Sequence, residues 1–127
     1  MKRAMLFAAA PALFAASPAG ATETILCRVD GRADLSLSLV IGHLVGPQLS
    51  QVLIDDRGRM RHAGGDGAPL MLVQSWLDDR EIRADVADAN GEAYVARLRV
   101  HRAGRDRYRG TLRYAERVHP VTCSAEG

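Results

Sequence analysis

The chain has 127 residues with a formal net charge of +2, and 25% of its residues are charged but only 5% aromatic. This length suits one domain with a small hydrophobic core. The near balance of charge and the few aromatic side chains argue against a nucleic-acid-binding protein, which needs a basic surface and rings for base stacking.

Residues 1–21 have the three parts of a secretory signal peptide. The basic pair Lys2-Arg3 precedes the mostly apolar run 4–16, and Ala19-Gly20-Ala21 supplies the small side chains that signal peptidase requires. We expect cleavage after this tripeptide, which leaves one domain, residues 22–127, in the periplasm or outside the cell. The apolar run is shorter than the roughly 20 residues of a spanning helix, so we expect no transmembrane segment after cleavage.

Apolar and polar residues alternate through most of the remaining chain, which indicates strands with one buried face. The apolar members of the clearest runs are Leu35, Leu37, Leu39 and Ile41; Ile82, Ala84 and Val86; Ala96, Leu98 and Val100; and Tyr108, Leu112 and Tyr114. Turn-forming residues separate the runs at Asp30-Gly31, Gly46-Pro47, Asp56-Arg57-Gly58, Gly64–Gly67, Asn90-Gly91 and Ala103-Gly104. Their regular spacing is typical of a meander of β-hairpins.

The segment 47–57 allows two interpretations. Pro47 and Gly58 bracket apolar residues at helical spacing, but the run Val52-Leu53-Ile54 favours a strand that ends in a hairpin turn. We predict a strand, with a short helix as the alternative. Together with the other runs, this strand gives an all-β domain of eight or nine strands.

The two cysteines, Cys27 and Cys123, lie near the ends of the domain. In an exported protein such a pair predicts a disulfide, here between the first strand and the last. These strands are neighbours in an up-and-down barrel with an even number of strands. We therefore predict a small antiparallel β-barrel closed by a Cys27–Cys123 disulfide, with a β-sandwich as the second choice.

Positive charge is concentrated near the carboxyl end of the chain. Residues 97–127 contain eight arginines and three acids, whereas residues 22–96 contain seven arginines and twelve acids. Strand alternation turns the cationic side chains of two successive strands to the same outer face. They are Arg97, Arg99 and His101 on one strand, and Arg107, Arg109 and Arg113 on the next. Arginines opposed across a hairpin repel each other, so nearby acids or an anionic partner must compensate them.

Both kinds of compensation are open on the sequence alone. Glu81 and Asp85 point outward on the preceding strand and can pair with the arginines on a solvated surface. Alternatively, four strand arginines form a site for an anionic ligand or an anionic envelope partner, because a guanidinium group donates in a fixed fork that suits phosphate and carboxylate. These four are Arg97, Arg99, Arg109 and Arg113. The sequence thus predicts a binding module whose partner it does not identify.

We find no catalytic or metal-binding pattern in the sequence. The serines lie in no nucleophile motif, and the disulfide uses both cysteines. The histidines are too far apart in the sequence to show the short spacings of metal ligands; they are His43, His62, His101 and His119. We expect no enzyme activity, no metal and no cofactor; the alternative is a small enzyme with an interior site around His43, His62 or His119. Trp76, at the end of an apolar run, is expected in the core.

A short segment around the first cysteine resembles a known group of proteins. Leu26-Cys27-Arg28-Val29-Asp30-Gly31, together with the terminal Cys123, resembles the small periplasmic β-barrel lysozyme inhibitors. The resemblance implies a periplasmic inhibitor of a cationic hydrolase, although the chain has no Ser-Gly-x-x-Tyr inhibitory loop. An inhibitor of this kind would use an acidic surface that includes Asp78, Asp79 and Glu81.

Overall fold

Each alternating run forms a strand of one sheet. The computed structural model describes residues 22–126, and the expected signal peptide, 1–21, lies outside the described residues. The strands are β1 (Thr22–Val29), β2 (Arg32–Gly42), β3 (Gln48–Asp56), β4 (Arg59–Ala63), β5 (Met71–Leu77), β6 (Glu81–Ala87), β7 (Tyr94–Gly104), β8 (Arg107–Tyr114) and β9 (Arg117–Glu126). Residues 22–126 contain no helix, so the segment 47–57 is a strand, β3, as predicted. Over this range no helix is long and apolar enough to span a bilayer.

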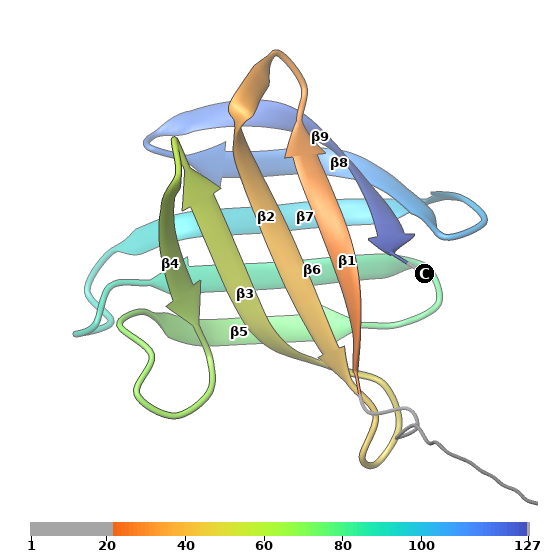
Figure 1. Ribbon diagram of the computed structural model, residues 1–127, viewed down its shortest axis with the longest axis horizontal. Coiled ribbons are helices and arrows are strands. Elements are labelled where there is room, and N and C mark those ends of the chain that lie inside the picture. Colours follow the sequence, from red (N-terminus) through yellow and green to blue (C-terminus); the bar gives the residue numbers. More distant parts are fainter. Residues whose placement is uncertain (1–21, 127) are drawn as a thin grey trace, which may run out of the picture.

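The nine strands form a nearly closed antiparallel barrel (Figure 1). Their order in the sheet is β4-β3-β2-β1-β9-β8-β7-β6-β5. Although the number of strands is odd, β1 and β9 are antiparallel neighbours, because β4 and β5 run in the same direction. Ala63 at the end of β4 and Leu70 just before β5 form a parallel bridge, and β5 also contacts β3, the neighbour of β4. β4 and β5 are therefore the two edge strands that meet where the barrel nearly closes, and the loop 64–69 connects them.

The disulfide lies in the middle of the sheet. Cys27 of β1 and Cys123 of β9 are direct register partners, with Cα atoms 3.9 Å apart, and both side chains are fully buried. The predicted link between the first and last strands is confirmed. It joins residues 96 positions apart, for which the chain-entropy treatment gives a stabilisation of about 4–5 kcal/mol.

The interior of the barrel is packed with aliphatic side chains. In Figure 1, β2 and β3 cross in front of β6 and β7, and the core lies between these layers. Its largest buried members are Leu35, Leu37, Leu39, Ile41, Val52, Ile54, Ile82, Val86, Leu98, Val100, Leu112 and Val121. Two buried tyrosines, Tyr108 and Tyr114, lie near opposite ends of β8, and the hydroxyl of each accepts a hydrogen bond from an arginine. The polar chemistry is therefore at the rims and on the outer face of the barrel.

The expectation of a buried Trp76 is wrong, because its side chain is 48% exposed. β5 contains a bulge between Leu72 and Gln74, which reverses the alternation along the strand. Leu72 packs against the core, whereas Trp76 stands opposite Arg83 on the outer face. The guanidinium carbon of Arg83 lies 5.2 Å from the centroid of the Trp76 ring, and the indole N–H donates to Asp78 at 2.9 Å.

Candidate functional site

The hairpin of β7 and β8 carries the predicted arginines on the outer face of the barrel. Its register pairs Arg97 with Arg113 and His101 with Arg109, while Leu98, Val100 and Leu112, at alternate positions along the two strands, are buried. Two like charges, Arg97 and Arg113, therefore stand directly opposite each other, as expected. Arg99 lies on the same side of β7, two residues along. We refer to the surface formed by Arg97, Arg99, Arg109 and Arg113 as the arginine face.

Arg97 and Arg99 converge on the carboxylate of Asp85 in β6. Asp85 is only 2% exposed, although it lies on the outward side of its strand, because the two guanidinium groups cover it. Nε of Arg97 donates to Oδ1 at 3.2 Å, and Arg99 donates to both oxygens, at 2.9 and 3.2 Å. Burial alone would raise the pKa of Asp85, but the hydrogen bonds and charges of Arg99 and Arg97 hold this pKa below its ordinary value. The expected pairing with nearby acids is thus present for these two arginines.

The charges on the arginine face do not cancel. Glu81, the second expected acid, lies 3.7 Å from Arg83 and 3.9 Å from His101, away from the four arginines. Within residues 22–126, Arg109 and Arg113 form no ion pair with any described side chain. Arg97 and Arg99 therefore share the single carboxylate of Asp85, and Arg109 and Arg113 have no acidic partner in this part of the chain.

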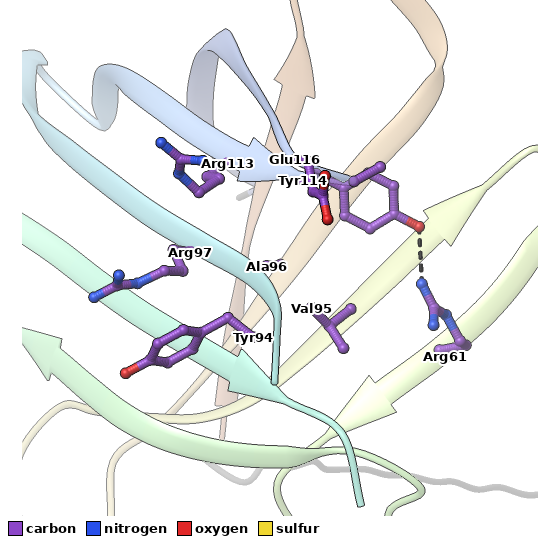
Figure 2. A pocket seen from close by; sticks show the side chains of 9 residues that line it. Arg61, Tyr94, Val95, Ala96, Arg97, Arg113, Tyr114 and Glu116 are labelled. Atoms are coloured by element: carbon purple, nitrogen blue, oxygen red, sulfur yellow. Dashed lines mark hydrogen bonds between the residues drawn. The ribbon is translucent and has the colours of Figure 1, made fainter. Parts of the chain in front are cut away.

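A hollow of about 320 Å³ opens at the rim of the barrel beside Arg97 and Arg113 (Figure 2). The guanidinium carbon of Arg97 lies 4.2 Å from the centroid of the Tyr94 ring, a stacking contact that restrains the side chain. Figure 2 shows Arg97 and Arg113 extending in the same direction, away from Tyr114. The residues that line the hollow are Arg61, Tyr94, Val95, Ala96, Arg97, Arg113, Tyr114, Ala115 and Glu116. With three arginines and one acid, this lining favours an anion.

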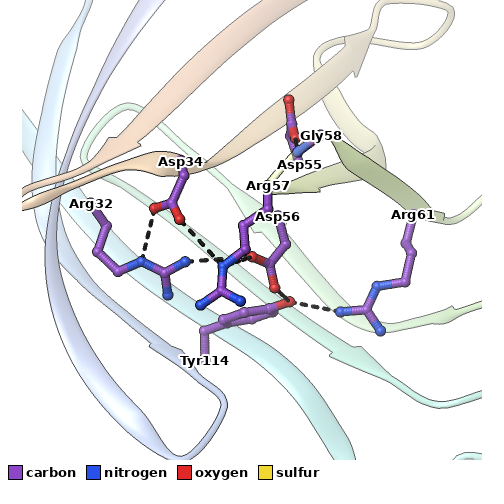
Figure 3. Close-up of polar contacts among 8 residues, drawn as sticks. All are labelled: Arg32, Asp34, Asp55, Asp56, Arg57, Gly58, Arg61 and Tyr114. Carbon is purple, nitrogen blue, oxygen red and sulfur yellow. Dashed lines mark hydrogen bonds and ion pairs between the residues drawn. The ribbon is translucent and has the colours of Figure 1, made fainter.

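A polar network at the barrel mouth holds Arg61 in place (Figure 3). Nη2 of Arg61 donates to the hydroxyl of Tyr114 at 2.8 Å, and that hydroxyl donates to Oδ2 of Asp56 at 2.7 Å. Arg32 donates to Asp56 at 3.4 Å and to Asp34 at 3.0 Å. Burial and the hydrogen bond to Asp56 raise the pKa of Tyr114. This phenol is therefore a protonated hydrogen-bond donor at neutral pH and not a base.

The four histidines lie on separate elements of the fold. His43, in the loop after β2, lies 3.0 Å from the carboxylate of Glu23. His62 is in β4, His101 is in β7 and His119 is in β9. In the described part of the chain, no group of three or more histidine, cysteine, aspartate or glutamate side chains is arranged to hold a metal ion.

A second hollow, of about 310 Å³, lies around Tyr108 near the other end of β8. Its acidic lining residues are Glu23, Asp78, Asp79 and Asp106. Two of the acids expected on the surface of a hydrolase inhibitor, Asp78 and Glu81, contact neighbouring groups of this chain. The carboxylate of Asp78 accepts the backbone N–H groups of Arg80 and Glu81, at 2.8 and 2.9 Å, and Glu81 itself faces Arg83.

Sequence reasoning did not find the contribution of Tyr94, Arg61 and Tyr114 to the rim. Tyr94 comes just before the alternating run of β7, and regular alternation would turn residues three positions apart to opposite faces, so no sequence pattern indicated its contact with Arg97. Arg61 and Tyr114 are 53 residues apart, and no local pattern in either strand indicates that their side chains meet.

A comparison of the chain with protein-family models, with curated proteins and with solved structures found no significant match.

Proposed function

We propose that this protein is an exported β-barrel binding module that holds an anionic ligand or partner on the arginine face. In this proposal the signal peptide, residues 1–21, directs the chain to the periplasm or out of the cell. The buried Cys27–Cys123 disulfide supports an oxidising compartment. The observation that carries the binding role is the sharing of one carboxylate, Asp85, by Arg97 and Arg99 beside an uncompensated Arg113.

Part of the site is ordered before any ligand arrives. Asp85 and the Tyr94 ring hold Arg97, and Asp85 holds Arg99, so an anion would immobilise few additional rotamers. An anion between Arg97 and Arg113 would also relieve the repulsion of two like charges across the ladder. Because a guanidinium fork donates two parallel hydrogen bonds, carboxylate, phosphate and sulfate groups all fit this chemistry.

The first test is retention on immobilised heparin, used as a sulfated probe. Arg113→Ser and Arg109→Ser should each elute at a lower salt concentration than the wild type, since each removes a guanidinium group that has no acidic partner among the described residues. Arg59→Ser is the matched control, because Arg59 is exposed in β4 and its loss changes the net charge equally. Arg99 is not substituted, because its loss would leave the buried Asp85 short of a partner.

Two results would contradict the proposal. One is a wild-type protein that heparin does not retain at low salt. The other is an equal loss of retention in Arg59→Ser, which would mean that only the overall charge matters.

The second hollow favours a second candidate, an inhibitor of a cationic hydrolase such as lysozyme. The carboxylates of Asp79 and Asp106 line this hollow and form no ion pair among the described residues, so they are available to a basic partner. The test is the rate at which lysozyme clears a cell-wall suspension in the presence of the protein. Wild-type protein should slow clearing and Asp79→Asn should slow it less; unchanged clearing with the wild type would end this candidate.

A further inference from the structure

A second cationic subsite lies on the same outer face, across β1, β9 and β8. Arg28 of β1 is the register partner of Thr122 in β9, and Thr122 is the register partner of Arg109 in β8. All three face outward, because Cys27 and Cys123, next to them along their strands, are buried. Strands about 4.8 Å apart place the Cα atoms of Arg28 and Arg109 about 10 Å apart. Two arginine side chains over this span can grip one anion, with the Thr122 hydroxyl between them.

This second subsite also lacks acidic compensation. Neither Arg28 nor Arg109 forms an ion pair with a described side chain in residues 22–126. The residues that face outward on β8 and on β9 up to residue 124 include no carboxylate. They are Arg107, Arg109, Thr111 and Arg113 on β8, and Val118, Pro120, Thr122 and Ser124 on β9.

The two subsites are separated along β8. The first subsite is formed by Arg97 and Arg113 at the rim of the barrel. Arg113 is four residues from Arg109, which corresponds to about 14 Å at the rise of an antiparallel strand. A single phosphate, sulfate or carboxylate group cannot bridge that distance. The surface between the subsites carries the exposed Thr111, flanked by Pro120 of β9 and Arg99 of β7. A ligand that occupies both subsites must therefore be a chain with anionic groups at intervals.

We infer that the ligand of the arginine face is a linear acidic polysaccharide that lies along β8 and places one anionic group in each subsite. This inference rests on the proposed anion-binding function and names the class of its ligand. The hydroxyls of Thr111 and Thr122, next to the arginines of the two subsites, and that of Ser124, beside Arg107, suit the hydroxyl groups of sugars. Side chains on one outer face can thus meet both the hydrogen bonds and the charges of a saccharide.

The surface is less suited to nucleic acid. Bases bind by stacking on aromatic rings, and the outward residues of β8, β9 and β1 in the described range include no aromatic side chain. The exposed ring of Tyr94 is covered on one face by the guanidinium group of Arg97.

The experiment measures the affinity of the mature protein for heparin fragments of increasing length, from the disaccharide upward, by isothermal titration calorimetry. We expect weak binding of the disaccharide and an affinity gain on the order of tenfold or more once the fragment spans both subsites, because the second contact becomes intramolecular. Arg28→Ser should remove most of this gain and leave the disaccharide affinity unchanged at the first subsite. It should also reduce the salt dependence of the binding of the long fragment by a slope of about one. Arg59→Ser should leave both affinities unchanged.

Different results separate the inference from the proposed function. An affinity that does not change with fragment length would overturn the two-subsite arrangement and leave anion binding intact. No binding of any fragment would remove both. Single-stranded DNA or poly-glutamate with the same number of charges is compared at the same salt concentration; equal or tighter binding of either would overturn the assignment to a polysaccharide.

Discussion

The hydroxyl of Tyr114 in β8 donates a hydrogen bond of 2.7 Å to the carboxylate of Asp56 in β3, and so joins two strands across the mouth of the barrel. The same hydroxyl accepts a hydrogen bond from Arg61 in β4. β3 and β4 lie at one edge of the sheet, next to the gap before β5. The network therefore ties the open edge of the barrel to a strand deep in the sheet.

Tyr114→Phe should lower the free energy of unfolding by about 1–2 kcal/mol, because Asp56 and Arg61 each lose a hydrogen-bond partner in a half-buried setting. Urea unfolding followed by circular dichroism measures the change. Tyr94→Phe is the control, since Tyr94 is exposed and its contact with Arg97 uses the ring. An equal loss in the two variants would show that the Tyr114 hydroxyl has no special role.

The raised pKa of Tyr114 also predicts a loss of stability at high pH. The unfolded chain ionises this phenol at its ordinary pKa of about 10, and the folded protein ionises it only at higher pH. The contribution of Tyr114 to stability is therefore complete below about pH 10 and is lost as the pH rises through the folded pKa. Absorbance titration near 295 nm should show a tyrosine ionisation above the ordinary pKa of about 10 that is absent in Tyr114→Phe.

Asp85→Asn should destabilise the folded protein at neutral pH by about 1–2 kcal/mol, a modest value because both guanidinium partners are partly exposed to solvent. The pKa of Asp85 is lowered on folding, so its contribution is present above the unfolded carboxyl pKa of about 4 and is lost as the pH falls through the folded pKa. The unfolding free energies of wild type and variant should therefore converge at acid pH. Asp66→Asn, in the exposed loop after β4, is the control; a difference between wild type and Asp85→Asn that persists at low pH would contradict the ion-pair explanation.

The Cys27–Cys123 disulfide should resist reduction in the folded state, because neither cysteine is exposed. The oxidised protein should be about 2 Da lighter than its reduced form. A mild reductant should produce the free thiols only when denaturant is added. The double variant Cys27→Ser/Cys123→Ser should lose about 2–5 kcal/mol of stability in thermal or urea unfolding. Rapid reduction without denaturant would contradict the burial of this bond.

Glu116→Gly should stabilise the protein by about 1 kcal/mol. Ala115 and Glu116 form the two-residue turn between β8 and β9 with φ angles of 52° and 63°. This left-handed backbone conformation favours glycine and asparagine over other residues. Because Glu116 is also the one acid that lines the rim hollow, its removal should tighten the binding of heparin fragments. Glu116→Gln separates the two effects: it should tighten binding without the gain in stability.

The sequence predicted the strands, the barrel and the disulfide well, because these depend on local alternation and on the two cysteines. The position of Trp76 was predicted wrongly, since one extra residue in β5 reverses which side chains face the core, and no residue in Leu72-Val73-Gln74 marks the bulge. A closed barrel with an odd number of strands needs one pair of neighbouring strands that run in the same direction. Here that pair is β4 and β5, joined by the parallel bridge of Ala63 and Leu70. That bridge depends on where the chain returns after the loop, which local propensity does not determine.

For the candidate site, the sequence placed all four arginines on one outer face, and the register of β7 and β8 confirms this placement. It could not divide them into the two that cover Asp85 and the two that form no ion pair within residues 22–126. That division depends on the side-chain directions of three strands at once. The pairing of Tyr114 with Asp56, 58 residues apart, was equally beyond local reasoning, because nothing in either strand identifies its partner across the barrel.

The chain between Cys27 and Cys123 is a covalent ring, with the disulfide at the centre of the sheet and the loop 64–69 on the opposite side. A protease that cuts this loop would open the ring without releasing either part. The two fragments, β1–β4 and β5–β9, would remain joined by the disulfide and by the β1–β9 ladder. Fragments produced by cleavage in this loop would thus separate on a denaturing gel only after reduction, and a nicked molecule would keep the whole β7–β8 hairpin, with its arginines, on one intact fragment.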